Sequence, residues 1–463
     1  MAGQTNAIPT ELGTEKIGKL LKQYALPAII AQTAASLYNM VDSIFIGQGV
    51  GPLAISGLAV TFPLMNLSTA FGTLVGAGAA TMLSVLLGQQ HYKAANKVLG
   101  NVVSLNIIIG LLFMIFALVF IDPILYFFGA SENTLPYAKD YITIILYGNI
   151  ITHLYFGLNA AMRSTGFPKK AMGLTIFTVI FNTILDPIFI FVFDWGIKGA
   201  AWATVIAQTI AMLVVMGHFN NRSRAVHFEK GIFRLHWKVA KNSLTVGMGP
   251  FLMHTAACIV TLFINQQLRK YSGDLGIGAY GICNRFIFMF IMICMGLNQG
   301  MQPIAGYNYG ARQYARVREV FWKTAKFATI ITTACFLIGM FIPKAAVGIF
   351  THDEELMSLA STALRILTMM FPLVGFQMIG TNFFQSLGMV NKSIFLSLSR
   401  QLLFLLPCLY TLPLLIGTEG VWYSFVISDF LSFMLTAIFI RQIFKKFNRL
   451  KDGESPSILG SSI

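Results

Sequence analysis

The amino-acid sequence predicts an all-α integral membrane protein, with twelve transmembrane helices arranged as two six-helix lobes related by a parallel pseudo-two-fold repeat. Three observations predict this fold class: an apolar composition, twelve long apolar stretches, and a repeat at an offset of about 222 residues. Of the 463 residues, 56% are hydrophobic and 11% are charged. Soluble domains carry roughly 25% charged residues. A chain this apolar has too little polar surface to cover a soluble globule, whereas lipid contacts apolar side chains directly.

The apolar stretches are long enough to cross a bilayer, because a spanning helix needs roughly 20 mostly apolar residues. Only helices and closed barrels satisfy their backbone groups in lipid, and the stretches lack the alternation of barrel strands, so helices are predicted. The expected spans are about 20–46, 54–86, 96–120, 138–160, 170–193, 198–219, 242–268, 276–303, 321–342, 358–385, 393–416 and 420–442.

The basic residues alternate by side. With the N-terminus inside, 26 Lys and Arg residues fall in inner segments, among them Lys392 and Arg400, and six fall in outer segments. Arg285 is left as the one basic residue inside a span. This bias predicts a multi-pass protein of the bacterial plasma (inner) membrane with both termini in the cytoplasm. No cleavable signal peptide is expected in the polar stretch Met1–Lys16. Because the charges form no single patch, no nucleic-acid partner is expected despite the net charge of +15.

The two halves match in three places that occur in the same order. The matching segments are Gln89–Tyr92 with Ala311–Tyr314, Phe128–Glu132 with Phe350–Glu354, and Gly196–Gly199 with Gly417–Gly420. Each half has an even number of spans, so both halves begin on the same side of the membrane and form a parallel repeat. The expected domains are a cytoplasmic N-terminal tail (1–16), a first lobe (17–220), a basic linker (221–239), a second lobe (240–446) and a cytoplasmic tail (447–463).

Three carboxylates lie inside spans, where a charge costs roughly 2.5–3.5 kcal/mol on insertion scales. They are Asp42, Asp186 and Asp429. At 1.5 Å per residue, Asp42 lies roughly 30 Å beyond Lys22 and Asp186 roughly 24 Å beyond Lys170, which puts both in the outer half of the membrane. Helical spacing puts Tyr38 on the face of Asp42 and Asn182 on the face of Asp186. Thr204 lies near the outer start of span six, so these five residues are candidates for one cluster.

Two carboxylates among oxygen donors suit a proton or a hard cation such as Na⁺, because two neighbouring desolvated carboxylates resist double ionisation. The alternative is that each Asp caps a local break in its helix and binds no ion. Pro187 favours this alternative at Asp186, since it removes a helical hydrogen bond. We favour cation or proton coupling through the cluster, with Asp42, Asn182, Asp186 and Thr204 as the candidate Na⁺ ligands.

Other residues are candidates for a hinge and for a substrate path. Pro27 is the candidate hinge in span one, with a static kink as the alternative. The candidate substrate path contains Asn159, Arg285, Gln377 and Asp429. A hydrogen bond to a neighbouring helix explains Asp429 equally well, and Arg285, near the outer end of span eight, is expected to snorkel or pair.

These residues together resemble the multidrug and toxic compound extrusion (MATE) family, in its MepA-like or DinF-like branch, from about Lys16 to Phe444. The resemblance is carried by Leu26-Pro27 and Tyr38–Ser43 with Gly47, by Asn182, Asp186 and Gly196–Thr204, and by Asn308–Ala311. It implies two lobes that alternate between inward and outward openings, and an antiporter that exports organic cations and drugs against protons or sodium ions, with a role in antibiotic resistance.

The resemblance matches Asp42, Asn182, Asp186 and Thr204 to first-lobe coupling residues of that family. One departure is that span seven carries no carboxylate, which puts second-lobe coupling of the kind found in some branches in doubt. The expected partners are small-molecule drugs and membrane lipid, the expected state is a monomer, and no cofactor is expected.

Two other functions are alternatives to export. A flippase for lipid-linked precursors of the same superfamily is the main one, although Arg285 alone within the spans argues against binding an anionic head group. An enzyme is not expected, because the spans show no nucleophile–base or His/Asp set at one depth.

Overall fold

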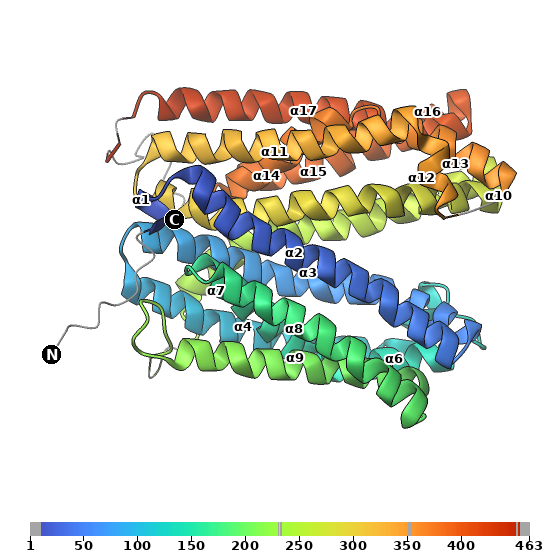
Figure 1. Cartoon of the computed structure of the whole chain (residues 1–463), viewed down its shortest axis with the longest axis horizontal. Helices are drawn as coiled ribbons and strands as arrows, with labels where there is room; N and C mark the ends of the chain where they lie inside the picture. Colours follow the sequence, from blue (N-terminus) through green and yellow to red (C-terminus); the bar gives the residue numbers. More distant parts are fainter. Residues whose placement is uncertain (1–10, 230, 232–233, 351–352, 451, 454–463) are drawn as a thin grey trace. The chain divides into compact units, whose positions relative to one another are not determined.

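The computed structural model describes residues 11–229, 231, 234–350, 353–450 and 452–453. Side chains at 37–41, 43–44, 47–48, 52, 55–56 and 274 are outside that description, and the side chain of Tyr38 is among them. Every regular element in the described part is a helix, as Figure 1 shows. The predicted all-α fold class is therefore confirmed.

The helices of the first half follow one another through short turns. They are α1 (Glu11–Thr14), α2 (Ile17–Gly49), α3 (Pro52–Gly88), α4 (Tyr92–Val119), α5 (Ile121–Phe127), α6 (Leu135–Tyr147), α7 (Asn149–Ser164), α8 (Pro168–Pro187), the π-helix η1 (Ile188–Val192) and α9 (Gly196–Asn220).

The second half repeats this order after the linker. Its helices are α10 (Trp237–Gly310), α11 (Tyr314–Phe341), α12 (Pro343–Gly348), α13 (Glu354–Thr368), α14 (Phe371–Ser386), α15 (Val390–Leu398), the π-helix η2 (Ser399–Leu405), α16 (Leu406–Ile416) and α17 (Thr418–Phe447).

The helices account for the predicted spans. Nine helical segments in the described part, two of them within α10, are long and apolar enough to cross a bilayer, and two bent pairs raise the number to eleven. The 33-residue helix α2, some of whose side chains are outside the description, supplies the remaining span. Helix α10 supplies two spans because its backbone is non-helical at Gly273, where φ is 61°. Each predicted stretch falls within these helices to within one residue.

Two predicted spans are bent rather than straight. The stretch 138–160 is divided between α6 and α7, which meet at 54°, and the stretch 358–385 between α13 and α14, which meet at 53°. Pro372 at the start of α14 explains the second bend, because proline has no amide hydrogen and its ring clashes with the preceding turn of a helix. Gly148 separates α6 from α7 and lies against Val205, where a larger side chain would collide.

The backbone shows the repeat directly. Helices α4 and α11 begin 222 positions apart, at Tyr92 and Tyr314, and each follows a non-glycine residue in the left-handed region, Gln90 (φ 61°) and Arg312 (φ 58°). The fifth and eleventh spans each contain a π-helix, η1 and η2. Equivalent turns and equivalent irregularities therefore recur at one sequence offset.

The chain packs as two compact units that do not follow the repeat boundary. Unit 1 comprises Met1–Thr14 and Ile30–Phe251, and unit 2 comprises Glu15–Ile29 and Leu252–Ile463. The chain passes between units after Ile29 and after Phe251, positions that are again 222 apart. Pro27 and Pro250 lie just before these two positions. The six-helix lobes with bounds 17–220 and 240–446 remain a prediction.

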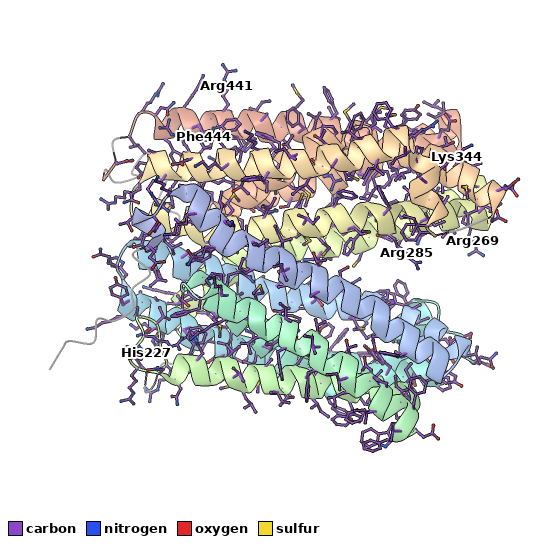
Figure 2. The ribbon with its side chains drawn as sticks, viewed as in Figure 1. His227, Arg269, Arg285, Lys344, Arg441 and Phe444 are labelled. Atoms are coloured by element: carbon purple, nitrogen blue, oxygen red, sulfur yellow. The ribbon has the colours of Figure 1, made fainter. Side chains whose placement is uncertain are left out.

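Much of the surface of each unit is apolar. Phe127, Ile349 and Leu415 are each 78% exposed, and many other large apolar side chains are exposed along the helices. Figure 2 shows such side chains along the outer faces of the helices, with labelled basic residues such as Arg269, Lys344 and Arg441 among them. A surface of this composition is suited to lipid, which confirms that the protein is a multi-pass membrane protein.

Candidate functional site

Asp186 lies where a membrane helix changes its geometry. It is the second-last residue of α8, and Pro187 follows it before the chain widens into the π-helix η1. Proline cannot donate a backbone hydrogen bond, and π-turns inside helices occur frequently at functional sites. The fold thus combines a backbone break with a buried carboxyl group at this point.

Asp42 and Asp186 come together from α2 and α8. Their carboxyl groups lie within interaction distance of each other, and both are buried, with 5% and 0% of their surface exposed. A carboxylate can only accept hydrogen bonds, so a hydrogen bond between two carboxyl groups requires a proton on one of them. The pair is therefore a candidate for holding one proton between its two members.

Asn182 and Thr204 lie next to the pair within unit 1. The Asn182 amide donates from Nδ2 to Thr204 Oγ1 at 3.1 Å, and Thr204 Oγ1 donates to the Ala200 carbonyl at 3.2 Å. Asn182 is one helical turn before Asp186, so the amide and the carboxyl group share a face of α8. Four of the five predicted coupling residues are thus placed on three helices, and the side chain of Tyr38 lies outside the described part.

A sixth residue was not predicted from the sequence. Tyr141 of α6 is 2% exposed and interacts electrostatically with both Asp42 and Asp186. Its ring belongs to an apolar cluster with Ile46 and Ile190, so the carboxyl pair is bordered by hydrocarbon. In the sequence, Tyr141 is a tyrosine near the outer end of span four. That position alone does not indicate a contact with residues of α2 or α8.

The four residues of the candidate substrate path are divided between the two units. Asn159 donates to the Ala171 carbonyl at 3.1 Å and ties α7 to α8, while Gln377 donates to Thr381 Oγ1 on its own helix at 3.3 Å. Arg285 is exposed, and Figure 2 shows its side chain pointing away from the helices of its own unit. Asn159 belongs to unit 1 and the other three to unit 2.

Asp429 is ion-paired. Its Oδ1 accepts a hydrogen bond from Arg400 Nε at 2.7 Å, and only 3% of its side chain is exposed. The assignment of Arg400 to an inner segment beside Lys392 is wrong, because Arg400 lies in η2, within the span Val390–Ile416. Arg400 lies eight residues, or roughly 12 Å of helix, beyond Lys392. That spacing was the sequence signal that Arg400 lies inside the span.

Comparison with known proteins agrees with this architecture. The MatE family model matches residues 27–188 and 250–411, which begin at Pro27 and Pro250, just before the chain passes from one unit to the other, and cover most of the chain. The multidrug export protein MepA of Staphylococcus aureus (strain MSSA476) is 27% identical over 411 residues, covering 89% of this chain and 90% of that protein. MepA of Staphylococcus haemolyticus (strain JCSC1435) is 27% identical over 94% of this chain and 95% of its own length.

Solved structures match over nearly the whole chain. The MATE multidrug transporter DinF-BH, solved in complex with rhodamine 6G, is 35% identical, with a TM-score of 0.86 over 97% of this chain and 99% of that one. An outward-facing MATE transporter of the MOP superfamily is 23% identical and shows the same fold, with a TM-score of 0.89 over 96% of this chain and all of that one. The chain therefore belongs to the MatE family and is a MATE transporter of the MepA/DinF-like kind.

Proposed function

We propose that this transporter exports organic cations and drugs in exchange for protons or sodium ions, by alternating access, as a monomer in the bacterial inner membrane with both termini in the cytoplasm. The observation that carries the proposal is the buried pair of Asp42 and Asp186 beside the Asn182–Thr204 hydrogen bond. The names of the relatives, multidrug export protein MepA and multidrug transporter DinF-BH, support the same activity.

Coupling requires that the ion and the drug prefer different conformations. A proton or cation at the carboxyl pair removes the repulsion between two desolvated charges and lets α2 and α8 approach. Helix α2 carries this change toward Pro27, because the helix continues unbroken from Ile17 to Gly49 and passes from unit 2 to unit 1 just after Pro27. A bend of α2 at Pro27 would then convert the binding of a proton or cation at Asp42 and Asp186 into a conformational change of unit 1.

The donor set accommodates either ion. Carboxylate, amide and hydroxyl oxygens are the ligands that hard cations prefer, and Asp42, Asp186, Asn182 and Thr204 supply all three kinds. Two buried carboxyl groups this close resist double ionisation, which favours the uptake of one proton by the pair. We therefore propose proton coupling as the principal mode.

The test is efflux of ethidium and of rhodamine 6G from energised cells that lack their own pumps. We expect rapid efflux with the wild type and loss of energy-dependent efflux with Asp42→Asn and with Asp186→Asn at equal expression. Asp140→Asn is the matched control, because Asp140 lies beside Tyr141 on α6 but is half exposed and paired with Lys198 at 3.3 Å. Full efflux in both site variants would remove coupling from this pair.

The flippase alternative makes a different demand on the protein. An anionic lipid head group needs an excess of positive charge, whereas the intramembrane guanidinium of Arg400 is already balanced by Asp429. Absence of dye efflux by the wild type would shift weight to that alternative.

A further inference from the structure

Arg400 is held in place by two adjacent residues of α17. It is the second residue of η2, where the wider π-turn disturbs the regular helical hydrogen bonds. The carbonyl of Arg400 accepts a hydrogen bond from Ser428 Oγ at 2.7 Å, and its Nε donates to Asp429 Oδ1 at 2.7 Å. Backbone and side chain are therefore both tied to α17, which fixes the direction of the guanidinium.

The rest of the guanidinium is available to a ligand. An arginine side chain has five N–H donors, of which four are on Nη1 and Nη2. Among the described residues, the one hydrogen bond that the guanidinium makes is that from Nε to Asp429. The Arg400 side chain is 27% exposed while that of Asp429 is 3% exposed, so the arginine is the accessible member of the pair. Unpaired donors at membrane depth are costly and favour an acceptor from outside the chain.

An aromatic surface lies next to these donors. Tyr280 interacts electrostatically with Arg400, and its ring stacks with that of Trp422 at a centroid distance of 6.3 Å and an interplanar angle of 20°. The ring of Phe425 is 6.1 Å away from that of Tyr280. Tyr280 and Phe425 are partly buried at the edge of the unit 2 core, as are Met369, Met370 and Met378. Aromatic and thioether side chains of this kind suit a planar aromatic molecule.

The charge of the pair limits the class of ligand. Arg400 and Asp429 together carry no net charge, so the site lacks the excess positive charge that a phosphate dianion or pyrophosphate requires. A single carboxylate can use the Nη donors in the charge-assisted geometry that guanidinium groups favour. We propose that Arg400 recognises the carboxylate of planar aromatic, zwitterionic substrates, with Asp429 as its positioning residue. This inference rests on the proposed export function and assigns to it a specificity-determining residue in unit 2.

Two matched dyes test the proposal. Rhodamine 6G is an ethyl ester and a cation, and rhodamine 19 is the free acid of the same dye and carries a carboxylate. The variant is the double substitution Arg400→Gln/Asp429→Asn, because removing the arginine alone would leave Asp429 buried without its partner. We expect the wild type to export both dyes. In the double variant we expect export of rhodamine 19 to fall about tenfold, as for loss of a charged hydrogen bond, and that of rhodamine 6G to stay within about twofold.

Arg441→Gln is the control, since Arg441 is an exposed arginine of α17 in the same unit and should leave both dyes unaffected. Unchanged export of rhodamine 19 by the double variant, or equal loss of both dyes, overturns the proposal. If the wild type exports neither dye, the proposed export function fails, and binding of the two dyes to purified protein, followed by fluorescence anisotropy, decides the role of Arg400 separately. Weaker binding of rhodamine 19 alone supports that role, and equal binding by wild type and variant refutes it.

Discussion

Gly247 of α10 packs directly against the backbone carbonyl of Leu74 on α3, so closely that no side chain fits between them. On the same contact surface, Gly78 lies against the carbonyl of Ser243. The repeat-equivalent contact in unit 2 brings Gly296 and Gly300 against Ile29 and Ala25 of α2. Glycine is required at these positions because two helices in lipid gain stability from close backbone approach.

We expect Gly247→Ala to destabilise the protein, because a Cβ at this position would overlap the Leu74 carbonyl and force α3 and α10 apart. Overpacking of this kind costs about 1–3 kcal/mol. Thermal melting of the detergent-solubilised protein measures the effect. Gly217→Ala is the control, because no atom lies within 4 Å of a Cβ built on Gly217 of α9. Equal melting temperatures for the two variants would contradict the importance of the contact.

The hydrogen bond between Asn182 and Thr204 should contribute to coupled transport. We expect Thr204→Val to lower the initial rate of dye efflux by about two- to tenfold, the range that corresponds to one hydrogen bond, and Thr204→Ser to restore it. Thr209→Val is the matched control, because Thr209 lies on the same helix and its Oγ1 donates to the carbonyl of Val205 in that helix. An unaltered rate for Thr204→Val would argue that the bond is structural.

The ion pair of Arg400 and Asp429 predicts a coupled effect on stability. We expect Arg400→Gln to lower stability by about 3–5 kcal/mol, because a buried carboxylate then loses its partner. The double variant Arg400→Gln/Asp429→Asn should be more stable than this single variant. Melting temperatures of wild type, both single variants and the double variant form the cycle that measures the coupling. Additive losses would mean that the two side chains do not interact.

Proton coupling should be visible in proteoliposomes. A pH gradient alone should drive dye transport, and replacement of Na⁺ by choline should leave the rate unchanged, because one proton is enough to relieve the repulsion within the buried Asp42–Asp186 pair. Fluorescence of the trapped dye follows the transport. If a sodium gradient drives transport and a pH gradient does not, Na⁺ would instead be assigned to the site. Its ligands would then be Asp42, Asn182, Asp186 and Thr204.

Pro27 offers a test of the hinge. Replacing it by alanine restores the amide hydrogen and removes the clash that a proline causes inside a helix, so Pro27→Ala should leave the melting temperature unchanged or raise it. We expect the same variant to export dye several-fold more slowly, because a stiffer α2 resists bending. A variant with the wild-type rate would show that the proline is a static kink.

Several features of this protein follow from its sequence alone. Membrane spans are local properties, since the bilayer selects any run of about 20 apolar residues, and each predicted stretch accordingly lies inside a helix or a bent pair of helices. The predicted depth of Asp42 and Asp186 also rests on local geometry, because a helix rises 1.5 Å per residue whatever surrounds it. The repeated turns at Gln90 and Arg312 are also visible in the sequence, because similar residues recur around them at an offset of 222 positions.

Contacts between helices were decided by the tertiary structure. Tyr141 reaches the carboxyl pair, and Asp429 finds Arg400, because helices distant in sequence pack side by side, and a single sequence does not say which faces meet. The bend between α6 and α7 depends likewise on a neighbouring helix, because Val205 of α9 lies against Gly148. Local chemistry thus determined which residues enter the membrane, and packing between distant segments determined which of them act together.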